Sequence, residues 1–416
     1  MRLPLPTFSS LLRRLAVVLL MTGLGALCFA ADAPPTPPAA APKEVRGIWV
    51  VRSTLTSPEG VRRVVIHAQR HHFNTLFVQV RGRGDAYYQS ALEPRAEALA
   101  GQPAEFDPLA SLITQAKAAG LRVHVWINAL YVWSSKKPPK SAAHLARAHP
   151  EWLAVDASGR RCRPGGAQVF VCPSNPEARA HLLAVIEDLL RRYDVDGLHL
   201  DYIRYPSANY CFCNRCLTAF AAEQGVSVET SPNRAALQHL RRQHPRAWQR
   251  YRRRQITSLV AAIRKSARSI RPQAKLSAAV IAWGRYQRNF THSAAYARVG
   301  QDWFGWIRDG LVDAVAPMTY QKSTAAYGAW AKGVQARWPR FPVWYGVAAY
   351  RVSPKSAAYK VNAVRQVGGR GWVLFSYGAV TREGANDAYL REMDRYLDPP
   401  VIPVPPARMA ALASAR

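Results

Sequence analysis

One eleven-residue segment carries the residue types best suited to chemistry. It reads Asp196-Gly197-Leu198-His199-Leu200-Asp201-Tyr202-Ile203-Arg204-Tyr205-Pro206. Because side chains alternate along a strand, His199 and Asp201 are expected on one face, opposite Leu198 and Leu200. Asp201 then lies at the carboxyl end of the strand, beside Arg204, where it can act on a bound substrate. The alternative is a buried ion pair between Asp201 and Arg204, but burying charge is costly even in pairs, so we favour the functional interpretation.

The elements around this segment predict a (β/α)₈ barrel, because apolar strand-like runs alternate with amphipathic helical runs. An open, doubly wound sheet is the alternative, but no glycine fingerprint for a nucleotide follows the first strand. The expected helices cover residues 58–71, 107–119, 176–193, 246–270, 301–310, 325–337, 357–367 and 384–396. The expected strands are Val45–Val51, Thr75–Val80, Arg122–Ile127, Gly197–Asp201, Lys275–Ile281, Asp313–Pro317, Val343–Val347 and Trp372–Phe375.

Two connections in this scheme are too long to be plain loops. They span residues 128–175, after the third strand, and 202–245, after the fourth. The first contains Glu151–Gly159, whose sequence predicts a strand and a turn. Both leave the carboxyl ends of strands, where barrels build their active sites, so long loops there are expected to border the site.

The chain ends differ from this folded part, which we assign to residues 44–397. Residues 1–31 have the basic start, apolar run and small residues of a secretory signal peptide, and the apolar run is too short for a comfortable membrane span. Cys28 raises the alternative of a lipoprotein, although the bulky Leu27 precedes it. Residues 32–43 read as a Pro/Ala linker, and residues 398–416 as a disordered Pro-rich tail. We expect no transmembrane segment, and a location in the periplasm or cell envelope.

The net charge of the 416-residue chain is +31, which favours anionic partners. For an exported protein these include peptidoglycan glycan, lipopolysaccharide phosphates and nucleic acid. No blocks of basic residues interleave with aromatic residues as in a single-strand binder, so we expect no nucleic-acid partner. An arginine-rich surface without a specific partner remains an alternative.

The central segment and several other stretches resemble the glycosyl-hydrolase-like family 10, formerly a domain of unknown function. The resemblance covers about residues 44–396. It implies a (β/α)₈ barrel that hydrolyses glycosidic bonds, with bacterial cell-wall glycan stripped of its peptides as a substrate type. It also implies that Asp201 matches the strand-four carboxylate that acts as nucleophile in related barrels. The other matching stretches are Glu44–Trp49, Gln79–Tyr88, His149–Trp152, Cys172–Pro176 and Gln301–Trp303.

Glycosidases generally use a second carboxyl group, one as acid and one as nucleophile or base. In some related barrels it follows strand five, but Ser277–Gly284 contains no carboxylate. Asp302 is our first candidate, with a helix cap as its alternative role. Asp85 is the second, with a salt bridge to a neighbouring arginine as its alternative, and Glu383 is the third.

Six further side chains are predicted to contact the sugar: Arg81, Trp126, Asn128, His199, Arg204 and Tyr320. Asn128 is suited to binding a hydroxyl, and Arg81 or Arg204 to gripping a muramyl carboxylate with two parallel hydrogen bonds. Aromatic rings stack on sugars but also fill cores, so each of them has core packing as its alternative. The same holds for the further candidate platforms Trp49, Trp283, Trp303 and Trp344.

The sequence after the signal contains five cysteines, namely Cys162, Cys172, Cys211, Cys213 and Cys216. The spacing of Cys211, Cys213 and Cys216 suggests a structural zinc site, with Cys172 as a fourth ligand. Disulfides, for example between Cys162 and Cys172, are equally open in an oxidising compartment. The chemistry at Asp201 requires no cofactor in either case.

These observations predict an exported glycosidase that acts on a bacterial polysaccharide, with peptidoglycan glycan strands as the favoured substrate. A carbohydrate-binding barrel without catalysis is the principal alternative, and the missing strand-five carboxylate supports it. A basic envelope scaffold that binds anionic polymer through charge alone is the third hypothesis.

Overall fold

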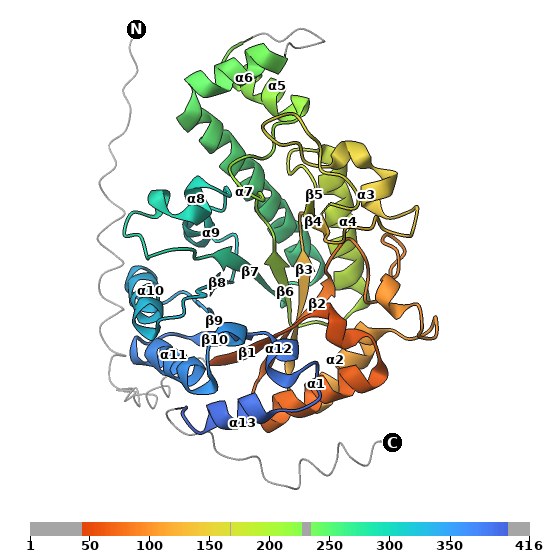
Figure 1. The fold of residues 1–416 in the computed structure, drawn as a ribbon, viewed down its shortest axis with the longest axis vertical. Coiled ribbons are helices and arrows are strands. Elements are labelled where there is room, and N and C mark those ends of the chain that lie inside the picture. The colour runs from red at the N-terminus through yellow and green to blue at the C-terminus, as the bar shows by residue number, and fades with distance from the viewer. Residues whose placement is uncertain (1–43, 167, 227–233, 398–416) are drawn as a thin grey trace, which may run out of the picture. The chain divides into compact units, whose positions relative to one another are not determined.

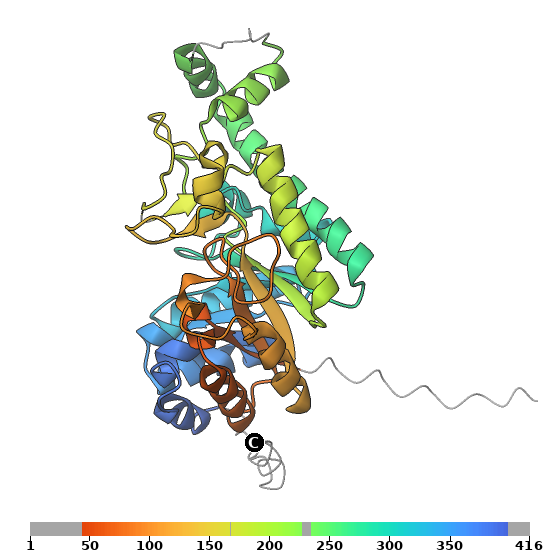
Figure 2. The same ribbon diagram turned by 90° about the vertical axis from the view of Figure 1, so that its right-hand side faces the viewer.

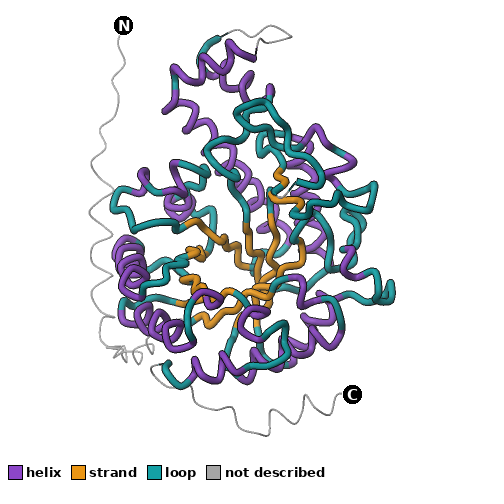
Figure 3. The backbone as a smooth tube through the Cα atoms, in the orientation of Figure 1, coloured by secondary structure: helices purple, strands orange, loops and turns teal. Residues whose placement is uncertain are grey.

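The computed structural model describes Glu44–Leu397, apart from residue 167 and residues 227–233. Eight parallel strands form one sheet in the centre, with helices outside it (Figures 1 and 3). The sheet runs in the order β8-β7-β6-β3-β2-β1-β10-β9. Its strands are β1 (Val45–Val50), β2 (Thr75–Arg81), β3 (Arg122–Asn128), β6 (Gly197–Asp201), β7 (Lys275–Ile281), β8 (Ala314–Met318), β9 (Tyr345–Ala348) and β10 (Gly371–Phe375).

The two ends of this sheet meet and nearly close the barrel. A single parallel bridge pairs Val315 of β8 with Val343, just before β9. The Trp344 N–H donates to the Val315 carbonyl at 2.9 Å, and the Val315 N–H donates to the Pro342 carbonyl at 3.3 Å. The predicted (β/α)₈ barrel is therefore confirmed, with each strand within two residues of its expected bounds.

The barrel interior holds a small aromatic layer distinct from the core between strands and helices. Trp49, Phe77, Trp126 and Trp344 fill it together with small aliphatic residues of β8. Gly197 makes room for the His124 ring, since a Cβ there would lie 2.4 Å from its Nδ1 atom. This layer forms the floor beneath the carboxyl ends of the strands.

The outer helices follow the predicted pattern, and several begin with a capping side chain and a proline. Ser57, Asp107 and Asn175 each accept a backbone N–H from the first turn, and each precedes a proline at the first helical position. These helices are α1 (Pro58–Arg70), α2 (Pro108–Ala118), α4 (Pro176–Arg192), α7 (Pro245–Ile270), α9 (Trp303–Arg308), α10 (Thr324–Arg337), α11 (Pro354–Gln366) and α13 (Ala388–Asp394).

The last helix departs from its expected range of residues 384–396. The structure has a shorter helix inside that range, α13 (Ala388–Asp394), and a short helix before it that was not predicted, α12 (Tyr377–Thr381). Gly384, at the expected start, has a φ of 90°, which a right-handed helix cannot include. The predicted helix is therefore present, but it begins four residues later and ends two residues earlier than expected.

The two long connections contain elements that the sequence reading did not anticipate. The connection after β3 holds β4 (Tyr131–Trp133), α3 (Leu145–Ala148) and β5 (Val169–Phe170), with β4 and β5 antiparallel. Glu151–Gly159 makes single bridges at Leu153 and Val155 in place of a full strand. The connection after β6 holds α5 (Asn214–Glu223) and α6 (Arg234–Gln243), which lie at one end of α7 (Figures 1 and 2).

The remaining short helices lie in connections around the barrel. They are α8 (Ala294–Ala297), η1 (Arg52–Leu55), η2 (Glu97–Leu99), η3 (Pro150–Trp152), η4 (Phe290–His292) and η5 (Ala349–Arg351), where η marks a 3₁₀ helix. None of the helices in the described part of the chain has both the length and the apolar character needed to cross a bilayer. The predicted signal peptide, linker and tail lie outside the described residues.

Candidate active site

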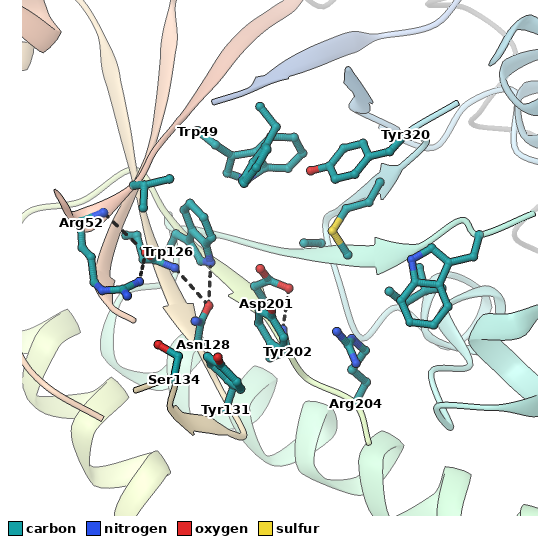
Figure 4. Close-up of a pocket in the computed structure, with 17 residues that line it drawn as sticks. Trp49, Arg52, Trp126, Asn128, Tyr131, Ser134, Asp201, Tyr202, Arg204 and Tyr320 are labelled. Carbon is teal, nitrogen blue, oxygen red and sulfur yellow. Dashed lines mark hydrogen bonds between the residues drawn. The ribbon is translucent and has the colours of Figure 1, made fainter. Parts of the chain in front are cut away.

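A cavity of about 390 Å³ opens at the carboxyl ends of the barrel strands. Seven of the barrel strands, all except β9, contribute to its wall or continue into residues that do. Figure 4 shows these side chains converging on one space. The lining residues are Trp49, Val51, Arg52, Gln79, Trp126, Asn128, Tyr131, Ser134, Asp201, Tyr202, Arg204, Ala279, Ile281, Trp283, Met318, Tyr320 and Phe375.

Asp201 is the one acidic residue among the described residues that line this cavity. It is the last residue of β6, and only 6% of its surface is exposed. Its Oδ1 atom accepts the Tyr202 backbone N–H at 2.6 Å. Burial raises the pKa of Asp201 to about 6, although the positive charge of Arg204 and the hydrogen bonds to the carboxylate oppose that shift. An acid with this pKa can both give and take a proton near neutral pH.

Arg204 lines the cavity beside Asp201 and keeps donor capacity unused. It is 8% exposed, its Nη1 donates to the Tyr205 carbonyl at 3.1 Å, and its Nε has no partner. The guanidinium lies against the Tyr202 and Trp283 rings, 4.7 and 5.6 Å from their centroids. The ion pair with Asp201, considered as the alternative to a functional role, is not formed within 4.0 Å among the described residues. The two aromatic faces therefore stabilise the charge of the guanidinium at the cavity wall.

The opposite wall is a polar network whose members satisfy one another. Arg52 donates to Gln79 Oε1 at 2.9 Å, and Gln79 Nε2 donates to Asn128 Oδ1 at 3.4 Å. Trp126 Nε1 also donates to Asn128 Oδ1 at 3.1 Å. Asn128 Nδ2 donates to the Gly82 carbonyl at 2.7 Å. Trp126 and Asn128 thus line the cavity, as the sequence predicted. Their polar atoms already form hydrogen bonds within the protein.

Several aromatic residues line the cavity or pack beside its entrance. Tyr320 lines it with its ring beside that of Phe375, at a centroid distance of 5.7 Å. Trp283 lines it with 46% of its surface exposed. Tyr350, 53% exposed, packs its ring edge on Tyr320 and Phe375. Such half-open rings are the side chains on which a sugar can stack.

Two predicted platforms lie elsewhere. Trp303 is fully buried against Phe290 and Phe304 in the outer core. Trp344 packs against Phe77 and His124 inside the barrel, below the cavity. Neither ring is among the residues lining the cavity, so both act in packing.

His199 and Arg81, both predicted as substrate contacts, are buried in the structure away from the cavity lining. Trp49 Nε1 donates to His199 Nε2 at 3.1 Å, so the proton sits on Nδ1, which donates to Ser277 Oγ at 2.9 Å. Burial holds the pKa of His199 well below its usual range. Arg81 forms an ion pair with Glu93 at 2.6 Å and donates to the Asn128 carbonyl. Both side chains support the strands that carry the cavity.

The three candidates for a second carboxyl group also lie outside the lining residues. Asp302 Oδ1 accepts the Gly305 N–H at 3.0 Å, which is the helix cap considered as its alternative role. Asp85 Oδ1 accepts the Arg83 N–H at 3.0 Å, and the two side chains form a weak ion pair at 3.5 Å. Glu383 accepts the Thr54 hydroxyl at 3.1 Å. The structure brings none of them to Asp201.

Sequence reasoning missed Arg52, Tyr131, Ser134 and Tyr202 in the cavity wall. Arg52 follows the carboxyl end of β1, so the same rule that selected Asp201 would have found it. Tyr131 comes with the unanticipated β4, where it stacks on Tyr202 with ring centroids 4.6 Å apart. No pattern in the sequence predicts the contact between Tyr131 and Tyr202, because this contact depends on how a long connection folds.

The cysteines lie outside this cavity. Cys172, Cys211, Cys213 and Cys216 gather in one cluster, and Cys162 stands apart from it. All five are free thiols in the structure, so the disulfide between Cys162 and Cys172 offered as an example is not present. Cys172 instead faces Cys213 and Cys216, its sulfur 3.7 and 3.5 Å from theirs.

A family model supports the resemblance seen in the sequence. The model described as Glycosyl hydrolase-like 10 matches residues 44–362. The chain belongs to the Glycosyl hydrolase-like 10 family. This member of the family contains the expected barrel, and the match includes β6, with Asp201, and the cysteine cluster.

Named relatives of this Glycosyl hydrolase-like 10 protein are distant in sequence. It is 24% identical to Glycosyl hydrolase DigH of Escherichia coli (strain K12) over 406 residues, which covers 83% of this chain and 84% of DigH. It is 25% identical to Glycosyl hydrolase YngK of Bacillus subtilis (strain 168) over 344 residues. That match covers 75% of this chain but only 62% of YngK.

Solved structures agree on the fold. The glycoside hydrolase domain of PgaB (BpsB) from Bordetella bronchiseptica has a TM-score of 0.62 at 15% identity, with 85% of this chain and 99% of that domain covered. The catalytic domain of beta-amylase from Paenibacillus polymyxa has a TM-score of 0.58 at 12% identity, with 88% and 100% covered. The family member therefore has the barrel fold of glycoside hydrolases.

Proposed function

We propose that this protein is a glycosidase that cleaves the glycan strands of peptidoglycan, with Asp201 as the proton donor. The observation that carries the proposal is a buried acid with a pKa near 6 at the cavity wall, beside an arginine with an unpartnered Nε. We further propose that it works in the periplasm or cell envelope, which the export signal predicted in residues 1–31 supports.

The charge of the cavity supports an anionic substrate. Arg52 and Arg204 line it with Asp201 as the one acid among the described lining residues, so two positive charges face one carboxyl group. A muramyl residue carries a lactyl carboxylate, and arginine binds carboxylates through paired hydrogen bonds. Arg204 is the better candidate, because Arg52 already donates to Gln79.

The presence of one acid in the described lining supports a substrate-assisted mechanism. Most glycosidases need two carboxyl groups, but substrate-assisted enzymes use the 2-acetamido group of the sugar as nucleophile. Asp201 would protonate the glycosidic oxygen while the C1–O bond breaks and the acetamido oxygen bonds to C1. The ionised Asp201 would then take a proton from the water that attacks C1 and reopens the ring. One glycosidic bond and one water are consumed, and the configuration at C1 is retained.

Other lining residues support the positioning of such a sugar. Burial raises the pKa of Tyr320 well above its usual value, so its hydroxyl keeps its proton and can donate to a substrate oxygen. Trp283 offers a half-exposed ring next to Arg204. These groups face the space beside Asp201, as Figure 4 shows for Tyr320.

The experiment measures new reducing ends from peptidoglycan glycan strands freed of peptides, incubated with the full chain. We expect cleavage, products that retain the configuration at C1, and no cleavage of the same strands after N-deacetylation. Inverted products, or equal cleavage of deacetylated strands, would exclude the substrate-assisted step.

A carbohydrate-binding barrel without catalysis is the second candidate, favoured by the same lack of a second acid in the described lining. It predicts that the protein sediments with glycan strands and releases no reducing ends. Sedimentation and end-group assays on one sample therefore separate the two functions.

A further inference from the structure

Four cysteines from the two long connections meet in one compact cluster. Cys172 comes from the connection after β3, whereas Cys211, Cys213 and Cys216 come from the connection after β6. Their four sulfur atoms all lie within 4.8 Å of one another. Three of the separations are 3.5, 3.5 and 3.7 Å, too long for a disulfide bond. They approach the edge of about 3.8 Å of a tetrahedron with Zn–S bonds of about 2.3 Å.

The surroundings of the cluster suit a closed metal site. Cys172, Cys211 and Cys216 are buried, and Cys213 is partly exposed. The Val155 N–H donates to Cys211 Sγ at 3.4 Å, the kind of contact that supports a ligating thiolate from behind. Cys172 and Cys213 also line a second cavity of about 440 Å³, which gives an ion a way in.

A buried cation near the cluster has no carboxylate to balance it. Arg252 is fully buried, and its hydrogen bonds go to Gln249 Oε1 at 3.0 Å and to two backbone carbonyls. Burial lowers the pKa of Arg252, so a charged guanidinium in this position needs a nearby negative charge. A zinc ion with four thiolates carries a net charge of −2, so an occupied site would supply the missing counter-charge.

We propose that Cys172, Cys211, Cys213 and Cys216 bind one Zn²⁺ ion in a structural site. Four thiolates complete the tetrahedron and leave no open position, which suits a structural ion and excludes a zinc-bound water. The ion ties together the two connections that flank the cavity. The segment from Asp201 to Cys211 carries Tyr202 and Arg204, so the site fixes one end of the chain that presents both side chains to substrate.

The packing between the two sites supports this coupling. Tyr205, one residue after Arg204, is buried with its ring 4.3 Å from the Arg252 guanidinium. Its carbonyl accepts the Arg204 Nη1–H. The Arg252 Nη2–H in turn donates to the Ser207 carbonyl at 2.7 Å. A continuous line of contacts therefore runs from Arg252, beside the cysteines, to Arg204 in the cavity.

The test combines metal analysis with thiol counting on the chain that follows the predicted signal peptide, residues 1–31, purified with and without added Zn²⁺. We expect one zinc per chain, four thiols protected from alkylation in the native protein, and five free thiols after unfolding with a chelator and no reductant. Four thiols that stay unreactive until a reductant is added would show two disulfides and overturn the proposal. Iron in place of zinc after expression with both metals would overturn it as well.

Two cysteine variants test which thiols bind the zinc ion. Cys213→Ser is expected to lose the zinc, and the matched control Cys162→Ser is expected to keep it, because Cys162 lies outside the cluster. If Cys213→Ser does not fold, the metal and thiol counts on the natural chain still decide the matter. The zinc count is independent of catalysis, so a protein that binds zinc but releases no reducing ends would refute the glycosidase proposal alone.

Discussion

The two sides of the cavity differ in how far their polar side chains are hydrogen-bonded within the protein. On the side of β1, β2 and β3, the polar groups of Arg52, Gln79, Trp126 and Asn128 are engaged with one another. On the side of β6 and β8, Arg204 Nε has no partner in the described structure, and Asp201 has a raised pKa. Polar groups left unsatisfied in a buried site cost free energy, so they mark the side where a ligand is expected to supply the partners.

This difference indicates that one side of the cavity fixes its shape and the other side carries the groups that act on a ligand. The engaged network holds its side chains in one arrangement and gives the cavity a fixed wall. The open side offers one proton donor and one cationic donor to whatever enters. Substitutions on the open side should therefore change catalysis and binding more than they change stability.

The largest effect is expected for Asp201→Asn. Loss of the proton donor should lower kcat for glycan strands by about 10²- to 10⁴-fold, because general acid catalysis contributes that much. Release of reducing ends measures this, and sedimentation with glycan should persist. The matched control Asp302→Asn keeps a side chain that can cap α9 and should retain activity. Activity within threefold of the natural protein in Asp201→Asn would exclude the proposed role.

The next effect is expected for Arg204→Met. Loss of the guanidinium should raise KM for glycan strands with lactyl carboxylates by about 10- to 100-fold, since hydrogen bonds to charged groups contribute about 1.5–3 kcal/mol. A neutral polymer of N-acetylglucosamine, used as the matched substrate, should show little change in KM or in binding. An equal rise in KM for both polymers would mean that Arg204 stabilises the cavity and does not bind the substrate carboxylate.

The pH dependence of activity tests the state of Asp201. A general acid must be protonated, so kcat/KM should fall about tenfold per pH unit above the pKa of Asp201, which burial raises to about 6. A rate profile between pH 4 and 9 measures this limb. A limb that starts near pH 4 would place the pKa at its ordinary value and contradict the effect of burial.

A loss of stability with rising pH accompanies this loss of activity. Burial raises the pKa of Asp201 from 3.8 to about 6, so the folded state binds its proton more tightly than the unfolded state. Stability from this group is therefore present below pH 4 and is lost as pH rises through 6, by on the order of 2–3 kcal/mol. Asp201→Asn should be more stable than the natural protein at pH 8, with a smaller difference at pH 4, by denaturant unfolding.

The smallest effect is expected for Asp302→Ala. Loss of the cap on α9 should lower the free energy of unfolding by about 1 kcal/mol, as for other N-cap substitutions. The kcat for glycan strands should stay unchanged, since Asp302 does not line the cavity. A large fall in kcat with little loss of stability would return Asp302 to the role of second acid.

The sequence predicts the barrel well because barrel strands are short apolar runs that do not depend on distant contacts to be recognised. Gly197–Asp201 is the strand β6 as expected, with Asp201 at its end. Trp126, Asn128, Arg204 and Tyr320 also reach the cavity wall. Alternation along a strand and the direction of its carboxyl end are local rules, so they transfer from sequence to structure.

Other site residues could not be placed by those rules. A register shift between Gln79 and Arg81 pairs Arg81 with Ile127 at the end of β2, where Glu93 engages it. His199 faces inward, yet Trp49 engages it below the cavity. Depth along the barrel axis depends on which neighbours fill the interior, and sequence periodicity does not contain that information. The cluster of Cys172 with Cys211 likewise depends on how two long connections fold against each other.

The barrel closes at its weakest joint between β8 and β9, near the amino ends of these strands. Only one bridge, at Val315 and Val343, joins β8 to β9, whereas β1 and β10 pair at five positions. Gly346 lets β9 come close to the Tyr320 ring, which a Cβ there would meet at 3.2 Å. Transient separation at this joint breaks few backbone hydrogen bonds, so amide protons near Trp344 should exchange faster than those of β6.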